Sequence, residues 1–234
     1  GDDAAGLAVS EKMRAQIRGM EQAERNVQDG ISMVQTAEGA LEEAGNIAQR
    51  MRELGIQAGN DTLASTDKAK IKSELNELQK EMGEIAKEAK FNGQELLTKK
   101  AADATFTVRA GANSEVREIK MTNLASIADD LSISSVNLST VGDAQSFVKK
   151  IDDALEKINN GRANLGAMQN RLEYTANNLT TTTENLSAAE SRIRDVDVAK
   201  EMVKLSKLNI LNQASQAMVS QAKQQPESVS QLLR

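Results

Sequence analysis

Large aliphatic residues recur at every seventh position through the second half of this chain of 234 residues. The series runs Ile151, Ile158, Leu165, Leu172, Leu179, Leu186 and Ile193, and no Pro interrupts it. This spacing places the side chains on one stripe of a helix about 45 residues long, which extends roughly 70 Å at about 1.5 Å per residue. A helix of this length cannot bury its stripe in a small globule, so it requires an equally long partner.

A second ladder with the same spacing occupies the N-terminal part of the chain and is predicted to be that partner. We expect one helix over residues 4–59, with Asp2 or Asp3 at its N-cap rather than at a metal. Its glycines allow two interpretations: packing holds a helix that tolerates them, or they let neighbouring helices approach closely. The ladder consists of Met13, Met20, Val27, Val34, Leu41 and Ala48.

The segment between the ladders is predicted to contain a shorter helix and one hairpin. The shorter helix is expected from Thr66 or Asp67 to about Lys90. Apolar residues that alternate with polar ones predict paired strands over 105–110 and 116–121.

These elements define the fold class as mainly α: an elongated antiparallel bundle of long helices, similar to a coiled coil, with one small β-hairpin. Residues 122–143 are rich in Ser, Asn and Asp and are expected to form a polar loop with one short helical turn near 125–131. We divide the chain into two N-terminal helices, the hairpin with its polar loop, the long heptad helix and a C-terminal helix. The corresponding ranges are 1–99, 100–143, 144–194 and 195–234.

The C-terminal helix differs from the others because residues 208–222 carry no charge. An exposed helix of a monomer usually carries charged residues that keep it soluble. An apolar stripe beside Asn, Gln and Ser therefore favours burial against other molecules, although an isolated polar tail helix remains the alternative.

The composition argues against several functional classes. The chain has no Cys, no His and no Trp, and its net charge is −5. Zinc, haem and iron–sulfur sites need thiolate or imidazole ligands, and common nucleophilic catalysis needs the same side chains. We therefore expect no enzyme, no cofactor and no metal site, no basic footprint for nucleic acid, and no membrane insertion.

Five blocks of sequence carry a resemblance to a known family. They are GDDAAGLAVSEKMRAQIRG at the start, QTAEGALEEAGNIAQRMRELGIQAGN over 35–60, KFNGQELL over 90–97, NRLEYTANNLTTTTENLSAAESRIRDVDVAKEM over 170–202, and NILNQASQAMVSQAKQQPESVSQLLR over 209–234. In these blocks the chain resembles bacterial flagellin of the short, Bacillus-like type. By this resemblance we expect the chain to lack roughly the first forty residues of the family.

The resemblance implies a structural subunit of the extracellular flagellar filament, exported by the flagellar secretion apparatus and used for motility. It implies several partners: other flagellin subunits, an export chaperone, the hook–filament junction and cap proteins, and the vertebrate Toll-like receptor that senses the monomer. A hook–filament junction adaptor of the same family is the alternative.

The resemblance also implies a receptor-binding surface. From the residues alone, the charged residues of this surface are ordinary solvated helix charges, and its Leu is a core residue. From the resemblance, Arg50 and Leu54 share one contact face, one turn apart. The expected receptor-binding residues are Gln49, Arg50, Arg52, Glu53, Leu54, Gln57 and Glu74.

Two further sets of residues follow from the resemblance. The C-terminal helix is expected to contact the export chaperone and then the filament core through Ile210, Leu211, Met218, Val219, Leu232 and Leu233. A joint between the outer and inner domains is expected at Arg192, Arg194, Asp195 and Asp197, for which solvated helix charges are an equally good interpretation.

Overall fold

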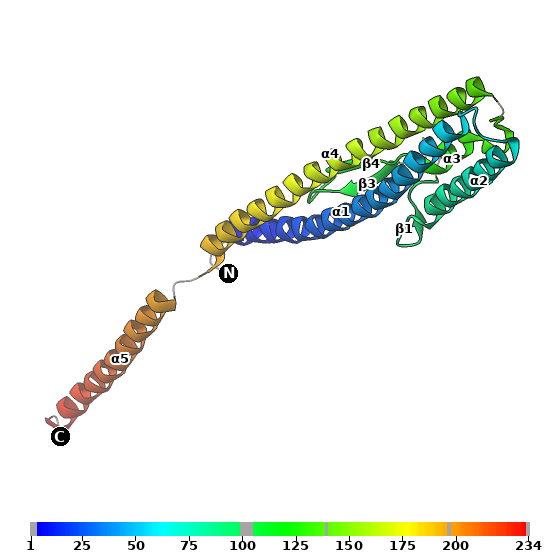
Figure 1. Ribbon diagram of the computed structural model, residues 1–234. Helices are drawn as coiled ribbons and strands as arrows, with labels where there is room; N and C mark the ends of the chain where they lie inside the picture. The colour runs from blue at the N-terminus through cyan, green and yellow to red at the C-terminus, as the bar shows by residue number, and fades with distance from the viewer. Residues whose placement is uncertain (1–3, 99–104, 139, 196–197, 233–234) are drawn as a thin grey trace. The chain divides into compact units, whose positions relative to one another are not determined.

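The computed structural model describes residues 4–98, 105–138, 140–195 and 198–232 (Figure 1). Its helices are α1 (Ala4–Ala58), α2 (Ser65–Glu88), α3 (Leu124–Leu131), α4 (Val141–Arg194) and α5 (Val198–Leu232), with a 3-10 turn η1 at Ile133–Ser135. Its strands are β1 (Lys90–Phe91), β2 (Gln94–Glu95), β3 (Thr105–Arg109) and β4 (Val116–Lys120). The chain forms two compact units, Met13–Ser187 and a second made of Gly1–Lys12 with Ala188–Arg234.

Within the first unit, α1 and α4 run antiparallel, side by side (Figure 1). Gly30 of α1 faces Leu172 of α4, and Gly55 faces Phe147. The predicted ladder of α4 is buried from Ile151 to Leu179. Its N-terminal counterpart is buried on α1, where Val27, Val34, Leu41 and Ala48 are fully enclosed. The expected antiparallel pairing of two long helices is confirmed.

The burial of the α4 ladder ends towards its C-terminus. Leu179 is 6% exposed, Leu186 is partly buried against the core, and Ile193 is 44% exposed. The seven-residue repeat therefore continues in the sequence after the point at which its side chains are buried by the described residues.

The glycines of α1 support both interpretations at different positions. A Cβ added to Gly19 would lie 3.0 Å from Cβ and 3.1 Å from Cα of Ala112, in the turn between β3 and β4. A Cβ added to Gly39 would have no neighbour within 4 Å. Close approach therefore explains Gly19, although its neighbour is a turn rather than a helix, whereas Gly39 is tolerated by a helix that packing holds in place.

The short helical turn expected near 125–131 is present as α3, but the surrounding segment, expected to be a polar loop, belongs to the core. Gln79 of α2 donates a hydrogen bond to the carbonyl of Ala128 at 2.7 Å and accepts one from the amide of Ile133 at 3.3 Å. The segment buries seven apolar side chains and is helical over α3 and η1. Those side chains are Leu124, Ile127, Ala128, Leu131, Ile133, Val136 and Leu138.

Two hairpins are present in the described residues, so the prediction of a single one is wrong. β3 pairs with β4 as expected, with Val108 opposite Arg117. The second hairpin joins β1 and β2 through Asn92 and Gly93, whose φ angles are 49° and 76°. Positive φ at both central residues is what a type I′ turn requires, and Asn-Gly is its preferred sequence. Strands of two residues are too short to show an alternating pattern.

The beginning of α2 also differs slightly from expectation. The helix starts at Ser65 rather than at Thr66 or Asp67, and Ala64 occupies the N-cap position without a side-chain hydrogen bond. Asp67 lies in the first turn, where its negative charge interacts favourably with the positive N-terminal end of the helix dipole. The expected capping by Asp2 or Asp3 falls outside the described residues.

The second unit contains the start of α1, the end of α4, and α5. Ser10 is 1% exposed and donates a hydrogen bond to Glu190 Oε1 at 3.0 Å. α5 leaves large apolar side chains exposed, including Val203 at 70% and Leu208 at 62%. No described helix is both long enough and apolar enough to span a lipid bilayer.

Candidate functional site

The predicted receptor-binding residues include an ion-paired group that spans two helices. Arg50 of α1 donates from Nη2 to Glu74 Oε1 of α2 at 3.0 Å and from Nη1 to Glu53 Oε2 at 3.2 Å. Its side chain remains 52% exposed, and that of Glu74 remains 47% exposed. The hydrogen bond from Arg50 to Glu74, and secondly that to Glu53, raises the pKa of the guanidinium above its ordinary value. A fixed, solvent-facing arrangement of one cation and two carboxylates results.

The helix positions explain how this group forms. Arg50 and Glu53 are three residues apart on α1 and therefore lie on neighbouring turns of one face. The adjacent face of α1 is apolar and buried through Met51, and α2 buries Ile71 and Leu75. Packing of these apolar faces presents Glu74 to Arg50 across 24 residues of sequence.

Leu54 does not belong to that exposed surface. It is 2% exposed and continues the buried stripe formed by Met51 and Ala58. The expectation that Arg50 and Leu54 share one contact face is therefore corrected: one turn of α1 separates them, but the Leu side chain points into the core. Leu54 supports the surface from beneath.

Arg52, another predicted receptor-binding residue, is directed towards α4. Its Nε donates to Asp152 Oδ1 at 2.6 Å, and both side chains are nearly half exposed. Gln49 and Gln57 are exposed on α1. The structure thus brings together Arg50, Glu53 and Glu74, and it assigns Arg52 to a separate ion pair whose partner the sequence analysis missed. We refer to Arg50, Glu53 and Glu74 as the ionic face.

The residues predicted for a domain joint surround the end of α4. Arg194 Nη1 lies 3.0 Å from Glu11 Oε1 and 3.9 Å from Glu190 Oε1. Ser191 donates a short hydrogen bond to Asp195. Glu11, Glu190 and Ser10 were not identified from the sequence. Arg192 is exposed, and Asp197 lies outside the described residues.

The predicted C-terminal contact residues are exposed along α5. Ile210 is 63% exposed, Leu211 is 51%, Met218 is 70% and Val219 is 56%. Leu232 belongs to α5, but its side chain is outside the described set, as is the whole of Leu233. Leu211 and Met218 lie on the same side of α5, and Ile210 and Val219 flank them on either side, so that the four span about half of the helix circumference. We refer to these four residues as the apolar face of α5.

The surface of the first unit also contains an open groove. It has a volume of about 570 Å³ and is lined by residues of α1, α4 and the β3–β4 turn, including Met20, Arg117 and Tyr174. Among the described residues, no group of three or more acidic, His or Cys side chains is arranged to hold a metal ion. The ionic face presents charged groups, and the apolar face of α5, in the other unit, presents exposed apolar side chains. Each of these features taken separately is common at protein-binding surfaces.

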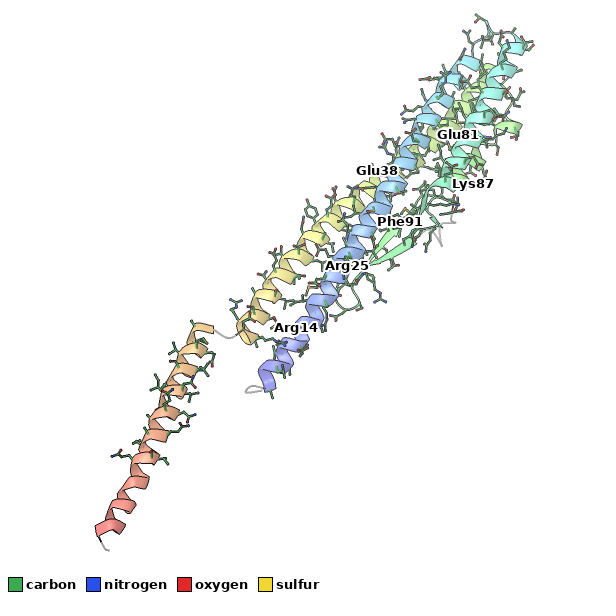
Figure 2. All side chains as sticks on the ribbon, turned by 90° about the horizontal axis from the view of Figure 1, so that it is seen from below. Arg14, Arg25, Glu38, Glu81, Lys87 and Phe91 are labelled. Atoms are coloured by element: carbon green, nitrogen blue, oxygen red, sulfur yellow. The ribbon has the colours of Figure 1, made fainter. Side chains whose placement is uncertain are left out.

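Charged side chains also line the outside of the bundle. Figure 2 shows Arg25 and Glu38 along α1 and Glu81 on α2. Glu38 lies 3.9 Å from Arg162 of α4, and Glu42 lies 3.8 Å from the same guanidinium. These ion pairs cross between the two long helices at the edge of their apolar seam, as flanking charges do in coiled coils.

Comparison with known proteins identifies the family to which these features correspond. Residues 1–102 match the bacterial flagellin N-terminal helical region, and residues 148–233 match the bacterial flagellin C-terminal helical region. The chain is 52% identical to a flagellin of Halalkalibacterium halodurans over 235 residues, which cover 100% of this chain and 86% of that protein.

Solved structures extend the comparison. The crystal structure of Bacillus cereus flagellin is similar at 32% identity and a TM-score of 0.59, covering 71% of this chain and 94% of that one. A structure described as a flagellar hook-associated protein of Vibrio parahaemolyticus is similar at 13% identity and a TM-score of 0.67, covering 82% of this chain and 98% of that one. The latter likeness concerns the fold alone.

Proposed function

The chain belongs to the bacterial flagellin family, and we propose that it serves as a structural subunit of the extracellular bacterial flagellar filament. The observation that carries this proposal is the match of both helical regions of the family, together with 52% identity along the chain. The paired α1 and α4 supply a stiff rod, and rods of this kind suit a polymer built by repeated contacts between identical copies.

A hook–filament junction adaptor is the alternative, because a hook-associated protein shares the fold. The fold therefore does not separate the two roles. Sequence identity does favour the filament subunit, since it is 52% and 32% to two flagellins but 13% to the hook-associated protein.

We further propose that the ionic face binds the vertebrate Toll-like receptor that senses flagellin monomers. Arg50 and Glu74 support this assignment because they come from two helices, remain half exposed, and are held 3.0 Å apart. An Arg whose position is fixed before binding loses less side-chain entropy when it contacts a partner. Gln49 and Gln57 flank the face on α1 and complete the proposed contact surface.

The test compares two arginines of α1. Arg50→Ala should reduce receptor activation by about tenfold, because it removes a fixed cation from the proposed interface. Arg52→Ala removes an arginine two residues away that is paired with Asp152 at 2.6 Å. This control should change activation by less than about twofold, since exposed ion pairs contribute little to stability.

Helicity of both variants, measured by circular dichroism, should equal that of the original chain. Unchanged activation by Arg50→Ala would remove the ionic face from the proposed receptor site. Equal losses in both variants would assign the effect to α1 as a whole.

We also propose that the apolar face of α5 contacts the flagellin export chaperone before secretion and neighbouring subunits in the filament. Its aliphatic side chains are more than half exposed, and the helix from Leu208 to Ala222 has no charged residue. An amphipathic helix of this kind is suited to an apolar groove on a partner. The junction and cap proteins remain proposed partners on the basis of the family.

A further inference from the structure

Two Asn-Gly dipeptides occur in this chain, and the fold treats them very differently. Asn92-Gly93 forms the turn between β1 and β2, whereas Asn160-Gly161 lies in the interior of α4. Asn-Gly is chemically fragile because the small Gly leaves its own backbone nitrogen accessible to the preceding side chain. The two dipeptides share this sequence, so any difference in reactivity between them has to come from structure.

The reaction needs only water and a suitable backbone conformation. The amide nitrogen of the Gly attacks Cγ of the Asn, a C–N bond forms, and the side-chain nitrogen leaves as ammonia with the proton from the Gly amide. Water then opens the five-membered ring at either carbonyl. One opening gives aspartate, and the other gives isoaspartate, in which the backbone runs through the former side chain.

Asn92 is placed to react. Asn92 and Gly93 are exposed, and a Cβ added to Gly93 would have no neighbour within 4 Å. Among the described residues, the Gly93 amide donates no backbone hydrogen bond and the Asn92 side chain forms none. The β1–β2 ladder has two residue pairs, Lys90 with Glu95 and Phe91 with Gln94, and the Leu96 amide donates to the Ala89 carbonyl at 3.0 Å next to them. Such a short hairpin opens locally at low cost, which allows the turn to rearrange for ring closure.

Asn160 is protected by the helix that surrounds it. Gly161 is buried, and its amide belongs to the interior of a helix of 54 residues, where it donates to the carbonyl four residues earlier. Thr122 and Leu41 crowd the position at which a Gly161 Cβ would lie. Ring closure here would require the middle of α4 to unwind against its packed partner. The same dipeptide is therefore kept from reacting.

We propose that Asn92 is the site at which the folded chain undergoes spontaneous deamidation. The site has structural consequences, because Leu96 and Leu97 follow the hairpin directly and are almost fully buried. Figure 2 shows Phe91, the residue before the turn, near Lys87 in the last turn of α2. Isoaspartate lengthens the backbone of a two-residue turn, so it disturbs the pairing of Phe91 with Gln94 and loosens this corner of the bundle.

The experiment measures the two sites in one sample. The folded chain is incubated in mildly alkaline buffer, and peptides containing Asn92 and Asn160 are quantified over time by mass spectrometry and by enzymatic methylation of isoaspartate. Asn92 should react at least about tenfold faster than Asn160, because only its turn opens easily. In denaturant the two rates should become similar, since the local sequences are equivalent.

A matched variant tests the assignment directly. Asn92→Gly removes the reactive amide and keeps a residue that accepts positive φ, as Gly-Gly also forms type I′ turns. This variant should lose the major isoaspartate signal while its circular dichroism stays unchanged. Asn113, which precedes Ser114 in the turn between β3 and β4, is an internal comparison. Equal rates at Asn92 and Asn160 in the folded chain, a faster reaction at Asn113, or persistence of the signal in Asn92→Gly would each overturn the proposal.

Discussion

α4 and α5 are both long helices that carry regularly placed aliphatic residues, yet they bury those residues to opposite extents. In α4, Ile151 and Ile158 are fully buried, and Leu165 is 1% exposed. In α5, Ile210 is 63% exposed and Met218 is 70% exposed. α4 also carries charged residues along its outer face, whereas α5 carries none between Leu208 and Ala222.

The difference teaches how the chain assigns its apolar surface. The aliphatic residues of α4 repeat at the same seven-residue interval as those of α1, so the two helices bury each other's apolar stripes within one chain. No described helix covers the apolar side chains of α5 in this way, and these side chains remain exposed and available to other molecules. Packing within the chain therefore stabilises α1 and α4, and contacts with partners are the proposed role of α5.

The largest expected effect comes from shortening one Ile in each helix. Ile158→Ala should lower the free energy of unfolding of the first unit by about 2–5 kcal/mol, because it leaves a cavity between α1 and α4. Ile210→Ala should change it by less than about 0.5 kcal/mol, because that side chain is 63% exposed. Denaturant unfolding followed by circular dichroism measures both values.

Ile193→Ala sharpens this comparison. Ile193 continues the heptad of α4 in the sequence, but it is 44% exposed. Its substitution should therefore resemble that of Ile210 more than that of Ile158. A large loss for Ile193→Ala, or a negligible one for Ile158→Ala, would contradict the burial pattern on which the comparison depends.

Much of the fold could be predicted because its main signal is long-range periodicity. A spacing of seven residues sustained through Ile151–Ile193 admits few structures other than a long helix with an equally long partner. The errors occurred in short elements. At α3 the helical turn is predicted correctly, but Ser and Asp dilute its apolar pattern, so the shared buried face of Leu124, Ile127 and Leu131 is missed. The β1–β2 hairpin follows α2 directly, so the turn signal at Asn92-Gly93 does not by itself distinguish a hairpin from the end of the helix.

Less of the ionic face could be predicted from the residues themselves. Residues four apart on a helix differ by about 40° in direction, which suffices to send Leu54 into the core while the long side chain of Arg50 reaches solvent. The partners of Arg52 and Arg194 depend on the register between α1 and α4. A heptad ladder can shift by seven residues and still match, so its spacing alone does not fix the ion pairs across it.

A smaller effect is expected for binding of the export chaperone. Leu211→Asp places a charge on the apolar face of α5, and it should weaken binding of the purified chaperone by about tenfold or more. Gln216→Asp introduces the same charge at an exposed polar position, where Gln216 Nε2 donates to Asn212 Oδ1 at 3.3 Å. This control should bind nearly as well as the original chain in isothermal titration calorimetry.

Neither substitution should alter unfolding of the first unit, because both lie on α5. Equal weakening by the two variants would assign chaperone binding to net charge rather than to the apolar face. Full binding by Leu211→Asp would remove that face from the proposed contact.

The smallest expected effect is a response to acid that distinguishes the two regions. The pKa of Glu95 is lowered from its ordinary value of 4.5, first because the Thr98 hydroxyl donates to its carboxylate and then because Lys90 is close. The charged carboxylate therefore stabilises the folded unit above pH 4.5, and this contribution disappears as the pH falls through the lower, folded-state pKa.

Thr98→Val should raise the pKa of Glu95 towards its ordinary value, as measured by NMR titration. The stretch from Leu208 to Ala222 has no titratable side chain, so the helicity of that stretch should not change through the same titration. An unchanged Glu95 pKa in Thr98→Val would show that the hydroxyl does not stabilise the carboxylate.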